Sequence, residues 1–329
     1  MALTNILHPN RYHGLVAQAP FFEGWYYKLV SADEKLRYAI IPGVYLAQDQ
    51  AESHCFVQVF DSKADQVRYH RYDYAAFKPS PDSFEIILGP NYFSADRIEL
   101  GIDDELGELN GALTFEPLSP WPVRFFSPGA MGWFAWVPFM ECYHGVVSMD
   151  HTIQGNLCLD GQSLDFSGGQ GYIEKDWGKR FPSAWIWGQS NHFNKPGTSL
   201  MVSVAVIPWL GRSFAGFIVG FLFEGIIYRF ATYNRSKIDE IRLEDKFAHL
   251  VLENGTHRLR VKAVRQEGGL LQAPTEIAMD RRILETLDAQ FEVQFETLEG
   301  VMLFQGVGKH GGLEIVGDLD RLLQMVRKQ

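Results

Sequence analysis

The stretch Phe247-Ala-His-Leu-Val-Leu-Glu253, followed by Asn254-Gly255 and Thr256-His-Arg-Leu-Arg-Val261, indicates the fold class of this chain. The residues on both sides of the Asn-Gly pair have the periodicity of β-strands. An Asn-Gly pair readily adopts the two positive φ angles of a type I′ turn. The stretch therefore predicts an antiparallel hairpin whose tight turn is Asn254-Gly255.

The same arrangement occurs twice more in the chain. Asp160-Gly161 lies between two strand-like runs, and Glu299-Gly300 is a weaker version of it. Only 319–326 has apolar residues at helical spacing, with Leu322 and Val326 on one face. We therefore predict a mostly-β, antiparallel protein with one short C-terminal helix.

Length and composition suit globular β domains and argue against several functional classes. The 329 residues would form two domains of about 165 residues each or one large all-β unit. Hydrophobic residues make up 46% and charged residues 21%, which is enough apolar material for a full core. The net charge of −10 argues against a nucleic-acid-binding protein, because such proteins neutralise phosphates with Lys and Arg. The three cysteines form no Cys-x-x-Cys motif, so neither a disulfide framework nor a zinc knuckle is predicted.

No targeting or membrane segment is predicted. The first twenty residues contain no continuous apolar core of a signal peptide. The most apolar stretch, 200–230, is interrupted by Pro208, Arg212 and Glu224, whereas a spanning helix needs about 20 apolar residues. We therefore expect a cytoplasmic protein.

A comparison of the chain with itself indicates an internal duplication. Trp25 matches Trp187 at an offset of 162 residues, and Phe56 matches Phe217 at an offset of 161. Further along, the Asp-Gly turn at 160–161 matches the Glu-Gly pair at an offset of 139, so the first copy contains about 23 extra residues.

The two copies predict two barrel-like domains, 1–180 and 181–329. A barrel of eight strands can enclose one small apolar ligand. The extra residues fall at about 117–140, where many prolines and glycines favour a loop over a strand. We interpret this aromatic loop either as a hydrophobic plug between the two halves or as a cover over a ligand cavity. Its aromatic residues are Trp121, Phe125, Phe126, Trp133, Phe134, Trp136 and Phe139.

Two segments, 21–27 and 171–191, carry acids and a lysine between large aromatic rings. Strand alternation would direct some of these charged side chains inward. Under the repeat alignment Glu174 corresponds to Leu313, so the acid cluster belongs to the first copy only, which favours a functional role. Two structural alternatives stay open: a solvated turn between the domains, and, for Glu23, a barrel-closing residue that accepts backbone hydrogen bonds.

No metal site is predicted. Cys142 and His144 share one face of a strand, but alternation places His151 on the other face, which argues against a metal cluster. The Gly-x-Gly-x-x-Gly motif at 306–311 is followed by only 18 residues, which is too few for a dinucleotide-binding βαβ unit.

The two charged segments also resemble the tocopherol cyclase family. The resemblance rests on Phe21-Phe-Glu-Gly-Trp-Tyr-Tyr27, Gly171-Tyr-Ile-Glu-Lys-Asp-Trp-Gly178, Phe181-Pro-x-x-Trp-x-Trp-x-Gln-x-Asn191 and Leu271-Gln-Ala-Pro-Thr275, in the family's order. It implies closure of a prenylated hydroquinone to a chromanol, as in vitamin E biosynthesis, without a cofactor. Through a distant similarity to hydroxyneurosporene synthase-type proteins, it also implies paired lipocalin-like domains. The chain differs from the plant members in having no long N-terminal transit region and in carrying Asp176 where their pattern has Asn.

The implied reaction needs an acid for the alkene, a wall that tolerates a carbocation, and groups that hold the quinol. A carboxyl group among aromatic rings is desolvated and stays protonated, and Glu174 and Glu23 are the candidates for this acid. Asp176 is the candidate base for the phenolic proton. The candidates for substrate binding are Trp25, Tyr26, Lys175, Trp177, Trp185, Trp187, Gln189 and Asn191.

Two other functions stay open. In a hydratase or isomerase acting on an isoprenoid or carotenoid, water would capture the same cation in a more polar cavity. A lipocalin-type carrier of a lipid or pigment would need the cavity only. In each case the expected partner is a small apolar ligand. We predict no nucleic-acid partner, no obligate protein partner, and transient contact with a membrane surface through 117–140.

Overall fold

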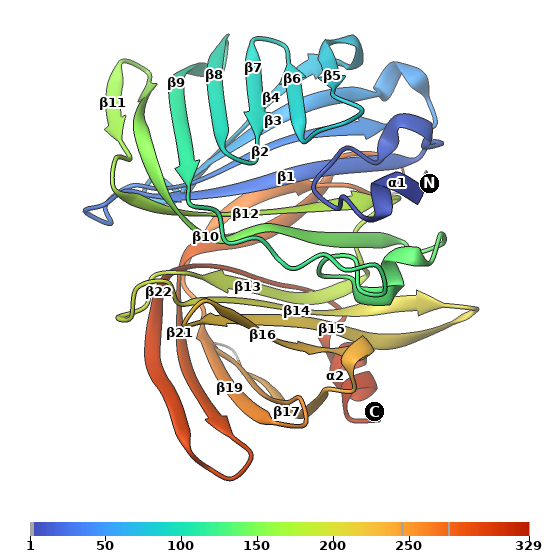
Figure 1. Ribbon diagram of the computed structural model, residues 1–329. Coiled ribbons are helices and arrows are strands. Elements are labelled where there is room, and N and C mark those ends of the chain that lie inside the picture. Colours follow the sequence, from blue (N-terminus) through green and yellow to red (C-terminus); the bar gives the residue numbers. More distant parts are fainter. Residues whose placement is uncertain (1–2, 245–246, 276, 329) are drawn as a thin grey trace. The chain divides into compact units, whose positions relative to one another are not determined.

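The computed structural model describes residues 3–244, 247–275 and 277–328, with the side chains from residue 5 onward (Figure 1). Its contacts divide the chain into unit 1, Met1–Phe181 with Leu270–Arg282, and unit 2, Pro182–Gly269 with Ile283–Gln329. The segment 270–282 thus belongs to unit 1, although the sequence-based division at 180/181 assigns it to the second domain.

Unit 1 is built on an antiparallel sheet with the strand order β4-β3-β2-β1-β12-β10-β9-β8-β7-β6-β5, while β11 pairs with β10 off this path. The strands are β1 (Phe21–Val30), β2 (Arg37–Leu46), β3 (His54–Asp61), β4 (Gln66–Asp73), β5 (Phe77–Pro79), β6 (Glu85–Leu88), β7 (Asn91–Ser94), β8 (Arg97–Asp104), β9 (Gly107–Glu116), β10 (Cys142–Leu159), β11 (Gln162–Asp165) and β12 (Gly169–Gly178).

Unit 2 contains a second antiparallel sheet, with the order β16-β15-β14-β13-β22-β21-β19-β18-β17. Its strands are β13 (Ala184–Ser190), β14 (Ser199–Trp209), β15 (Arg212–Phe223), β16 (Ile226–Ala231), β17 (Lys237–Glu244), β18 (Phe247–Glu253), β19 (His257–Val264), β21 (Arg281–Thr297) and β22 (Met302–Gly317), and β20 (Gly269–Ala273) lies off this path. Both sheets place the last long strand of the unit beside the first one, which agrees with a duplicated fold.

The helices are few and short. They are α1 (Leu3–Ile6), α2 (Leu319–Val326) and the 3₁₀ turns η1 (Gly14–Val16), η2 (Gln50–Glu52), η3 (Tyr74–Ala76), η4 (Gly132–Trp136) and η5 (Thr232–Asn234). The predicted C-terminal helix is confirmed: Asp318 caps α2 by accepting the backbone N–H of Arg321 at 3.0 Å, and Leu322 is buried. Within the described residues no helix has the length and apolar composition needed to cross a membrane.

The three predicted hairpins form, but their turns differ. Asp160 and Gly161 have φ angles of 49° and 80°, so this turn is type I′ as predicted. The turn after β18 is centred one residue later than predicted, because the N–H of Asn254 bonds to the carbonyl of His257 at 3.1 Å. Only Gly255, at the first central position, has a positive φ there, as in a type II′ turn.

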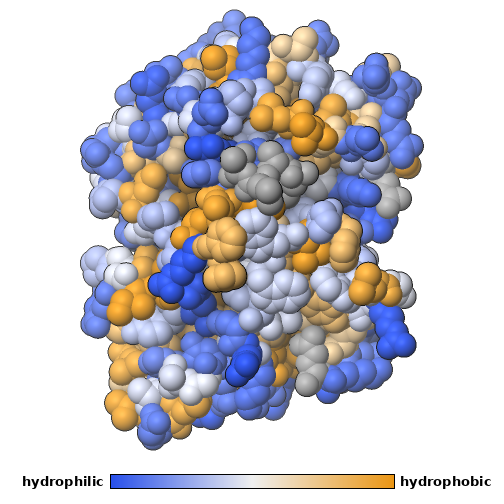
Figure 2. Space-filling view, turned by 45° about the vertical axis from the view of Figure 1, so that its right-hand side comes forward, coloured by the Kyte–Doolittle hydropathy of each residue, from blue (hydrophilic) through white to orange (hydrophobic). Residues whose placement is uncertain are grey.

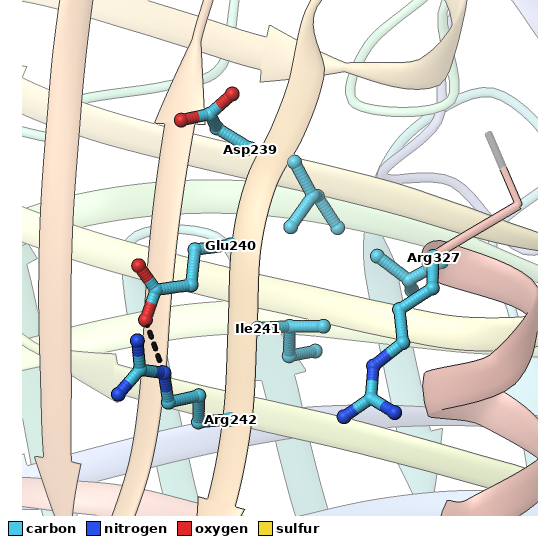
Figure 3. A pocket seen from close by; sticks show the side chains of 7 residues that line it. Asp239, Glu240, Ile241, Arg242 and Arg327 are labelled. Carbon is cyan, nitrogen blue, oxygen red and sulfur yellow. Dashed lines mark ion pairs between the residues drawn. The ribbon is translucent and has the colours of Figure 1, made fainter.

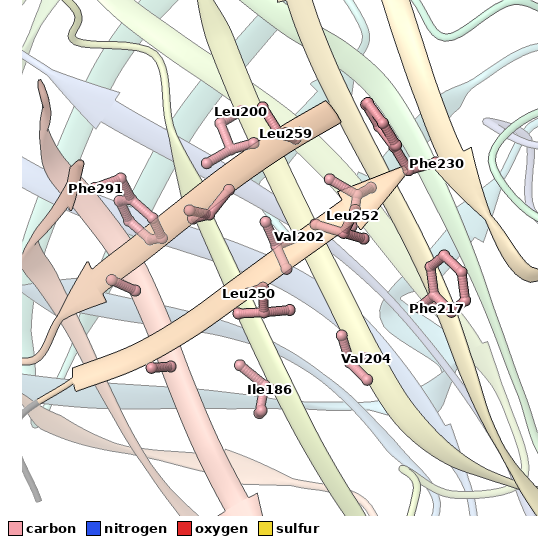
Figure 4. Close-up of a cluster of buried hydrophobic side chains, with 14 of the residues drawn as sticks. Ile186, Leu200, Val202, Val204, Phe217, Phe230, Leu250, Leu252, Leu259 and Phe291 are labelled. Atoms are coloured by element: carbon pink, nitrogen blue, oxygen red, sulfur yellow. The ribbon is translucent and has the colours of Figure 1, made fainter. Parts of the chain in front are cut away.

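The core of unit 2 fixes which face of each strand points inward (Figure 4). Ile186 of β13 and Val204 of β14 belong to one buried cluster with Leu250 of β18 and Leu259 of β19. Because strand residues alternate between faces, the neighbours of Ile186 on β13 point away from this core. We call that second face the outer face of unit 2.

The interior of unit 1 is defined by rings that meet across the sheet. Tyr27 of β1 lies 6.0 Å from Phe93 of β7 and 5.9 Å from Phe115 of β9, between ring centroids, although these strands are not its sheet neighbours. Trp25, two residues earlier, therefore also points inward. The opposite side of β1, β2, β3 and β12 is the outer face of unit 1.

The inward-facing residues of the two units show that the repeat alignment at Trp25 and Trp187 is shifted by one residue. Trp25 points into its barrel, whereas Trp187 lies on the outer face, so they are not equivalent. The pairing that keeps both interiors matches Tyr26 and its cross-strand partner Glu174 with Trp187 and its partner Glu314. The second copy therefore does carry an acid at the position of Glu174, and the predicted correspondence of Glu174 with Leu313 is wrong.

The aromatic segment between β9 and β10 is a loop, as predicted. Apart from η4 it contains one isolated β-bridge, between Arg124 and Ser127. It exposes several large apolar side chains, namely Phe125 (61%), Phe126 (84%), Trp133 (44%) and Phe139 (54%).

Candidate active site

Strand β12 separates the predicted charged cluster into two groups. It pairs with β1 on one side, where Lys175 faces Trp25, and with β10 on the other, where Asp176 faces His144. Alternation along β12 directs Lys175 and Trp177 into the barrel and Glu174 and Asp176 to the outer face. Glu174 and Lys175, adjacent in sequence, thus serve different sites.

The first group, which we call the inner cluster, consists of His13, Glu23 and Lys175. The ammonium group of Lys175 contacts Glu23 Oε1, the carbonyl of Arg11 at 2.5 Å and His13 Nδ1 at 3.2 Å. The backbone N–H of His13 donates to both oxygens of Glu23, at 3.1 and 2.9 Å. This cluster ties residues 11–13 to the barrel, which is the barrel-closing role considered for Glu23.

Two indole rings enclose the inner cluster. The Lys175 ammonium lies 4.6 Å from the ring centroid of Trp25 and 4.7 Å from that of Trp177. Such contacts stabilise a cation by about 0.5–2 kcal/mol each. Trp25 and Trp177 therefore face the lysine inside the barrel and not the carboxyl group of Glu174.

The pKa shifts in the inner cluster indicate that Glu23 is the ionised partner of Lys175. Burial lowers the pKa of Lys175 to about 8, although the Glu23 carboxylate opposes the shift. Burial alone would raise the pKa of Glu23, but Lys175 and His13 outweigh it and hold the pKa below its ordinary value. A carboxylate stabilised in this way is a poor proton donor.

The second group, the outer cluster, consists of His144, Tyr172, Glu174 and Asp176. The Tyr172 hydroxyl donates to Glu174 Oε2 at 2.5 Å, and His144 Nε2 lies 3.5 Å from the same oxygen. His144 Nδ1 is 3.0 Å from Asp176 Oδ1. The side chain of Glu174 is 6% exposed, against 28% for that of Asp176.

The outer cluster holds a protonated imidazole between two acids. Burial would lower the pKa of His144, but Glu174 and Asp176 outweigh it and raise the pKa to about 9. Burial, together with Glu174, raises the pKa of Tyr172 well above its usual value, so the phenol stays a hydrogen-bond donor. Two hydrogen-bonded pairs, Tyr172–Glu174 and His144–Asp176, therefore meet where His144 Nε2 lies 3.5 Å from Glu174 Oε2, and this arrangement can exchange protons.

One atom each from His144, Glu174 and Asp176 lies within 4.8 Å of the others, which is close enough for a shared cation. The donor set fits a cation poorly, however, because His144 Nδ1 makes a hydrogen bond to Asp176 and Nε2 faces Glu174 Oε2 at 3.5 Å, as in an imidazolium between two acids. A metal needs neutral imidazole, and the two acids favour the charged form here. We therefore treat these residues as a proton-exchanging group.

Comparison with known proteins identifies the family. The family model described as tocopherol cyclase-like matches residues 101–317, about two thirds of the chain. The chain belongs to the tocopherol cyclase-like family. The chloroplastic tocopherol cyclase of Zea mays is 27% identical over 199 residues, which are 56% of this chain and 41% of the maize protein. The chain thus spans less than half the length of this curated relative.

Solved structures similar to this member of the tocopherol cyclase-like family share its fold. CghA with Sch210972 aligns with a TM-score of 0.55 and 11% identity, covering 91% of this chain and 89% of that one. Kievitone hydratase from Nectria haematococca aligns with a TM-score of 0.50 and 9% identity, covering 90% and 89%. These matches confirm the predicted mostly-β fold of paired lipocalin-like domains.

The family motif at 271–275 belongs to unit 1. The backbone of Gln272, in the motif at 271–275, forms two hydrogen bonds with the side chain of Gln58, at 2.9 and 2.7 Å. Met279, on the same segment, packs on Phe22 and Phe56. Gln272 and Met279 therefore lie over the outer face of unit 1, at β3 and β1.

The other predicted site residues are distributed over both units. Tyr26 pairs with Glu174 across β1 and β12, so it belongs to the outer face of unit 1. Trp185, Trp187 and Gln189 lie on the outer face of β13 in unit 2, and Asn191 follows the end of that strand. Unit 1 thus brings Tyr26, Glu174 and Asp176 together on one face.

Sequence reasoning missed His144 and Tyr172. His144 was considered only with Cys142 and His151, but His151 points into the barrel, where its ring lies 4.9 Å from Phe115 and burial lowers its pKa to about 3. The one available signal was that Tyr172 and Glu174 are two residues apart on a predicted strand.

A pocket of about 270 Å³ in unit 2 does not involve these residues (Figure 3). It lies beside β17 and the end of α2, and the ion pair between Glu240 and Arg242, 2.5 Å long, is at its wall. Its lining is Ile238, Asp239, Glu240, Ile241, Arg242, Val326 and Arg327. This charged lining does not suit an apolar substrate.

Proposed function

We propose that the protein is a cofactor-independent cyclase that closes a prenylated hydroquinone to a chromanol, with the outer cluster as its proton donor. The observation that supports this proposal is the buried carboxyl group of Glu174, bonded by Tyr172 and flanked by His144. The family also supports it, since the maize relative is named a tocopherol cyclase.

The charge of the outer cluster favours an additional proton. Its two carboxylates and one imidazolium carry a net charge of −1, in a largely buried place where an unbalanced charge is unfavourable. Glu174 is the more buried of the two acids, so the proposal assigns the added proton of the reactive state to its carboxyl group. His144 faces both acids, with Nδ1 3.0 Å from Asp176 Oδ1 and Nε2 3.5 Å from Glu174 Oε2, so it can relay a proton between them.

The reaction then balances without any other reagent. The O–H bond of Glu174 breaks and its proton forms a C–H bond with the less substituted alkene carbon, leaving a tertiary carbocation. The phenolic oxygen forms the C–O bond as its O–H bond breaks, and its proton passes to Asp176. Transfer through His144, which lies between the two acids, returns a proton to Glu174, so the cluster ends with the number of protons it began with. Tyr26, the cross-strand neighbour of Glu174, supplies a ring that stabilises the cation by up to about 2 kcal/mol.

Hydration is the second candidate. Asp176 keeps a partly exposed side chain beside His144, so a water molecule can reach the cluster. A solved structure with the same fold is named a hydratase. If water instead of the phenol captured the cation, the product would carry a tertiary hydroxyl group and its mass would rise by one water.

Product analysis tests the proposal. The protein is incubated with a prenylated hydroquinone, and the products are separated by chromatography and weighed by mass spectrometry. We expect a chromanol with the mass of the substrate. A hydroxylated product would indicate that the enzyme catalyses hydration and not cyclisation. Binding of the quinol without any turnover would favour a carrier.

We also propose that the aromatic loop at 117–140 contacts lipid surfaces from which such substrates are taken. The loop exposes Phe125, Phe126 and Phe139, and its only charged residue is Arg124. Figure 2 shows hydrophobic residues among hydrophilic ones on one face of the molecule. Because the chain carries a net charge of −10, we expect binding to neutral rather than anionic bilayers.

A further inference from the structure

The outer face of unit 2 carries a second group of acids and aromatic rings. In the sheet register Trp187 of β13 lies opposite Glu314 of β22, and Glu314 lies opposite Glu285 of β21. These three side chains form a row across three strands. Trp185 and Gln189 flank the row on β13, two residues to either side of Trp187.

Gln189 is the most informative member of this group. It is 0% exposed, and neither its Oε1 nor its Nε2 has a hydrogen-bond partner within the described parts of the chain. A buried amide without partners destabilises the folded protein, because it has lost its water and gained nothing in return. Such a group is explained when a ligand supplies the missing hydrogen bonds.

The strands beside Gln189 and the tryptophans carry small residues. Gly312 of β22 lies opposite Gln189, so the residue that faces the amide directly across the sheet has no side chain. On the other side, Ser203 lies opposite Trp187 and Ala205 opposite Trp185. On the β14 side the two indoles therefore have small cross-strand neighbours, which suits contact with a flat ring.

The two acids favour a ligand that donates hydrogen bonds. Trp185 Nε1 donates to Glu314 Oε2 at 2.6 Å. Glu285 is 0% exposed and lies opposite Glu314, so both carboxyl groups belong to the same face as Gln189. A ligand hydroxyl group on this face can donate to either carboxyl group.

We propose that the outer face of unit 2 is a binding site for an aromatic ring that carries a hydroxyl group. Gln189 donates to and accepts from the hydroxyl, the carboxyl groups of Glu285 and Glu314 accept further hydrogen bonds, and Trp185 and Trp187 contact the ring. The inference deepens the proposed function, on which its choice of a phenolic ligand rests. It adds Glu285 and Glu314, which no sequence motif indicated.

Ligand binding can be measured without turnover. Isothermal titration calorimetry with methylhydroquinone, and with its dimethyl ether as the probe without a donor, is carried out on the full chain. We expect the hydroquinone to bind at least tenfold more tightly than the ether. Gln189→Leu should weaken binding of the hydroquinone about tenfold, because one hydrogen bond corresponds to about a tenfold change in Kd.

Gln294→Leu is the matched control. Gln294 lies on β21 of the same unit, on the face away from the core, and has no place in the proposed site. It should leave both affinities unchanged. Gln189→Leu should also melt at the same or a higher temperature than the wild type, because it removes an unpartnered amide, so a loss of binding will not reflect unfolding.

The outcomes separate this inference from the proposed reaction. Equal affinity for the hydroquinone and the ether, or a Gln189→Leu variant that binds the hydroquinone as well as the wild type, would overturn the site. Binding as expected without any chromanol from a prenylated substrate would overturn the cyclase proposal alone. Chromanol formation with unchanged binding in Gln189→Leu would overturn this inference alone.

Discussion

The inner cluster makes a prediction about stability that does not depend on catalysis. Lys175→Met removes a cation whose side chain is 0% exposed and leaves the equally buried Glu23 without its partner. Losing one member of a buried ion pair destabilises a protein by about 3–5 kcal/mol. For a folding unit of this size, that loss corresponds to a fall in melting temperature of roughly 10 °C.

The double variant Lys175→Met/Glu23→Gln should recover most of this loss. Replacing both members of a buried pair by neutral side chains of similar size is often close to neutral, because no charge stays buried. We therefore expect a coupling energy of about 2 kcal/mol or more in a double-mutant cycle measured by urea denaturation. Lys262→Met/Glu292→Gln is the control, since this cross-strand pair, 2.9 Å apart, is partly exposed and should couple by less than about 1 kcal/mol.

The cycle also distinguishes a structural from a catalytic Glu23. If the double variant were no more stable than Lys175→Met, the two residues would not form the pair described here. If the double variant were stable but lost an activity on a prenylated hydroquinone that Lys175→Met retains, Glu23 would belong to the proton-donating machinery.

Three further predictions concern the outer cluster and the aromatic loop. The pKa of about 9 for His144 lies above its unfolded value of 6.5, so the contribution of His144 to stability is complete below pH 6.5 and is lost as the pH rises through 9. Between pH 6.5 and 8 the free energy of unfolding should therefore fall by about 1.5 kcal/mol. His144→Gln should flatten this pH dependence, measured by urea denaturation. Tyr172→Phe removes the donor to Glu174, and we expect kcat to fall about ten- to a hundredfold while the melting temperature stays within a few degrees; an unchanged kcat would exclude this hydrogen bond from the reaction. Phe125→Ser/Phe126→Ser should weaken sedimentation with phosphatidylcholine vesicles at least tenfold, and equal sedimentation of wild type and variant would contradict lipid contact through this loop.

The sequence predicts those parts of the fold that depend on local chemistry. The type I′ turn at Asp160-Gly161 and the helix 319–326 are correct because a few adjacent residues determine them. The turn near Asn254 is displaced by one residue, since Asn254 uses its side chain to accept the N–H of Thr256 and of His257. Local sequence does not distinguish these two uses of an Asn-Gly pair.

The repeat alignment fails for a reason that is specific to β-structure. Shifting a strand by one residue exchanges its two faces, yet Trp25 and Trp187 both have aromatic or apolar neighbours, so either register is plausible in sequence. Only the packing of Tyr27 on Phe93 and of Ile186 with Leu250 shows which face is inside. The same one-residue difference hides the equivalence of Glu174 with Glu314.

The candidate site is only partly predictable for a related reason. Alternation correctly separates Glu174 from Lys175, and burial of both glutamates agrees with the sequence-based expectation. The sequence does not show that the two glutamates have different surroundings: the Glu23 carboxylate forms an ion pair with Lys175, whereas Glu174 accepts a hydrogen bond from Tyr172. His144 joins the outer cluster because the register between β10 and β12 places it opposite Asp176. That register depends on the packing of the whole sheet and not on residues near His144 in the sequence.

The rate of ring closure by Glu174→Gln tests the central claim most directly. The amide keeps the shape of the side chain but cannot donate a proton to an alkene, and removal of a general acid typically slows a reaction by about 10²–10⁴-fold. Glu108→Gln, an exposed glutamate on β9, serves as the matched control and should keep the wild-type rate. The account predicts that folded Glu174→Gln forms chromanol from a prenylated hydroquinone at least a hundred times more slowly than the wild type; formation at the wild-type rate would contradict it.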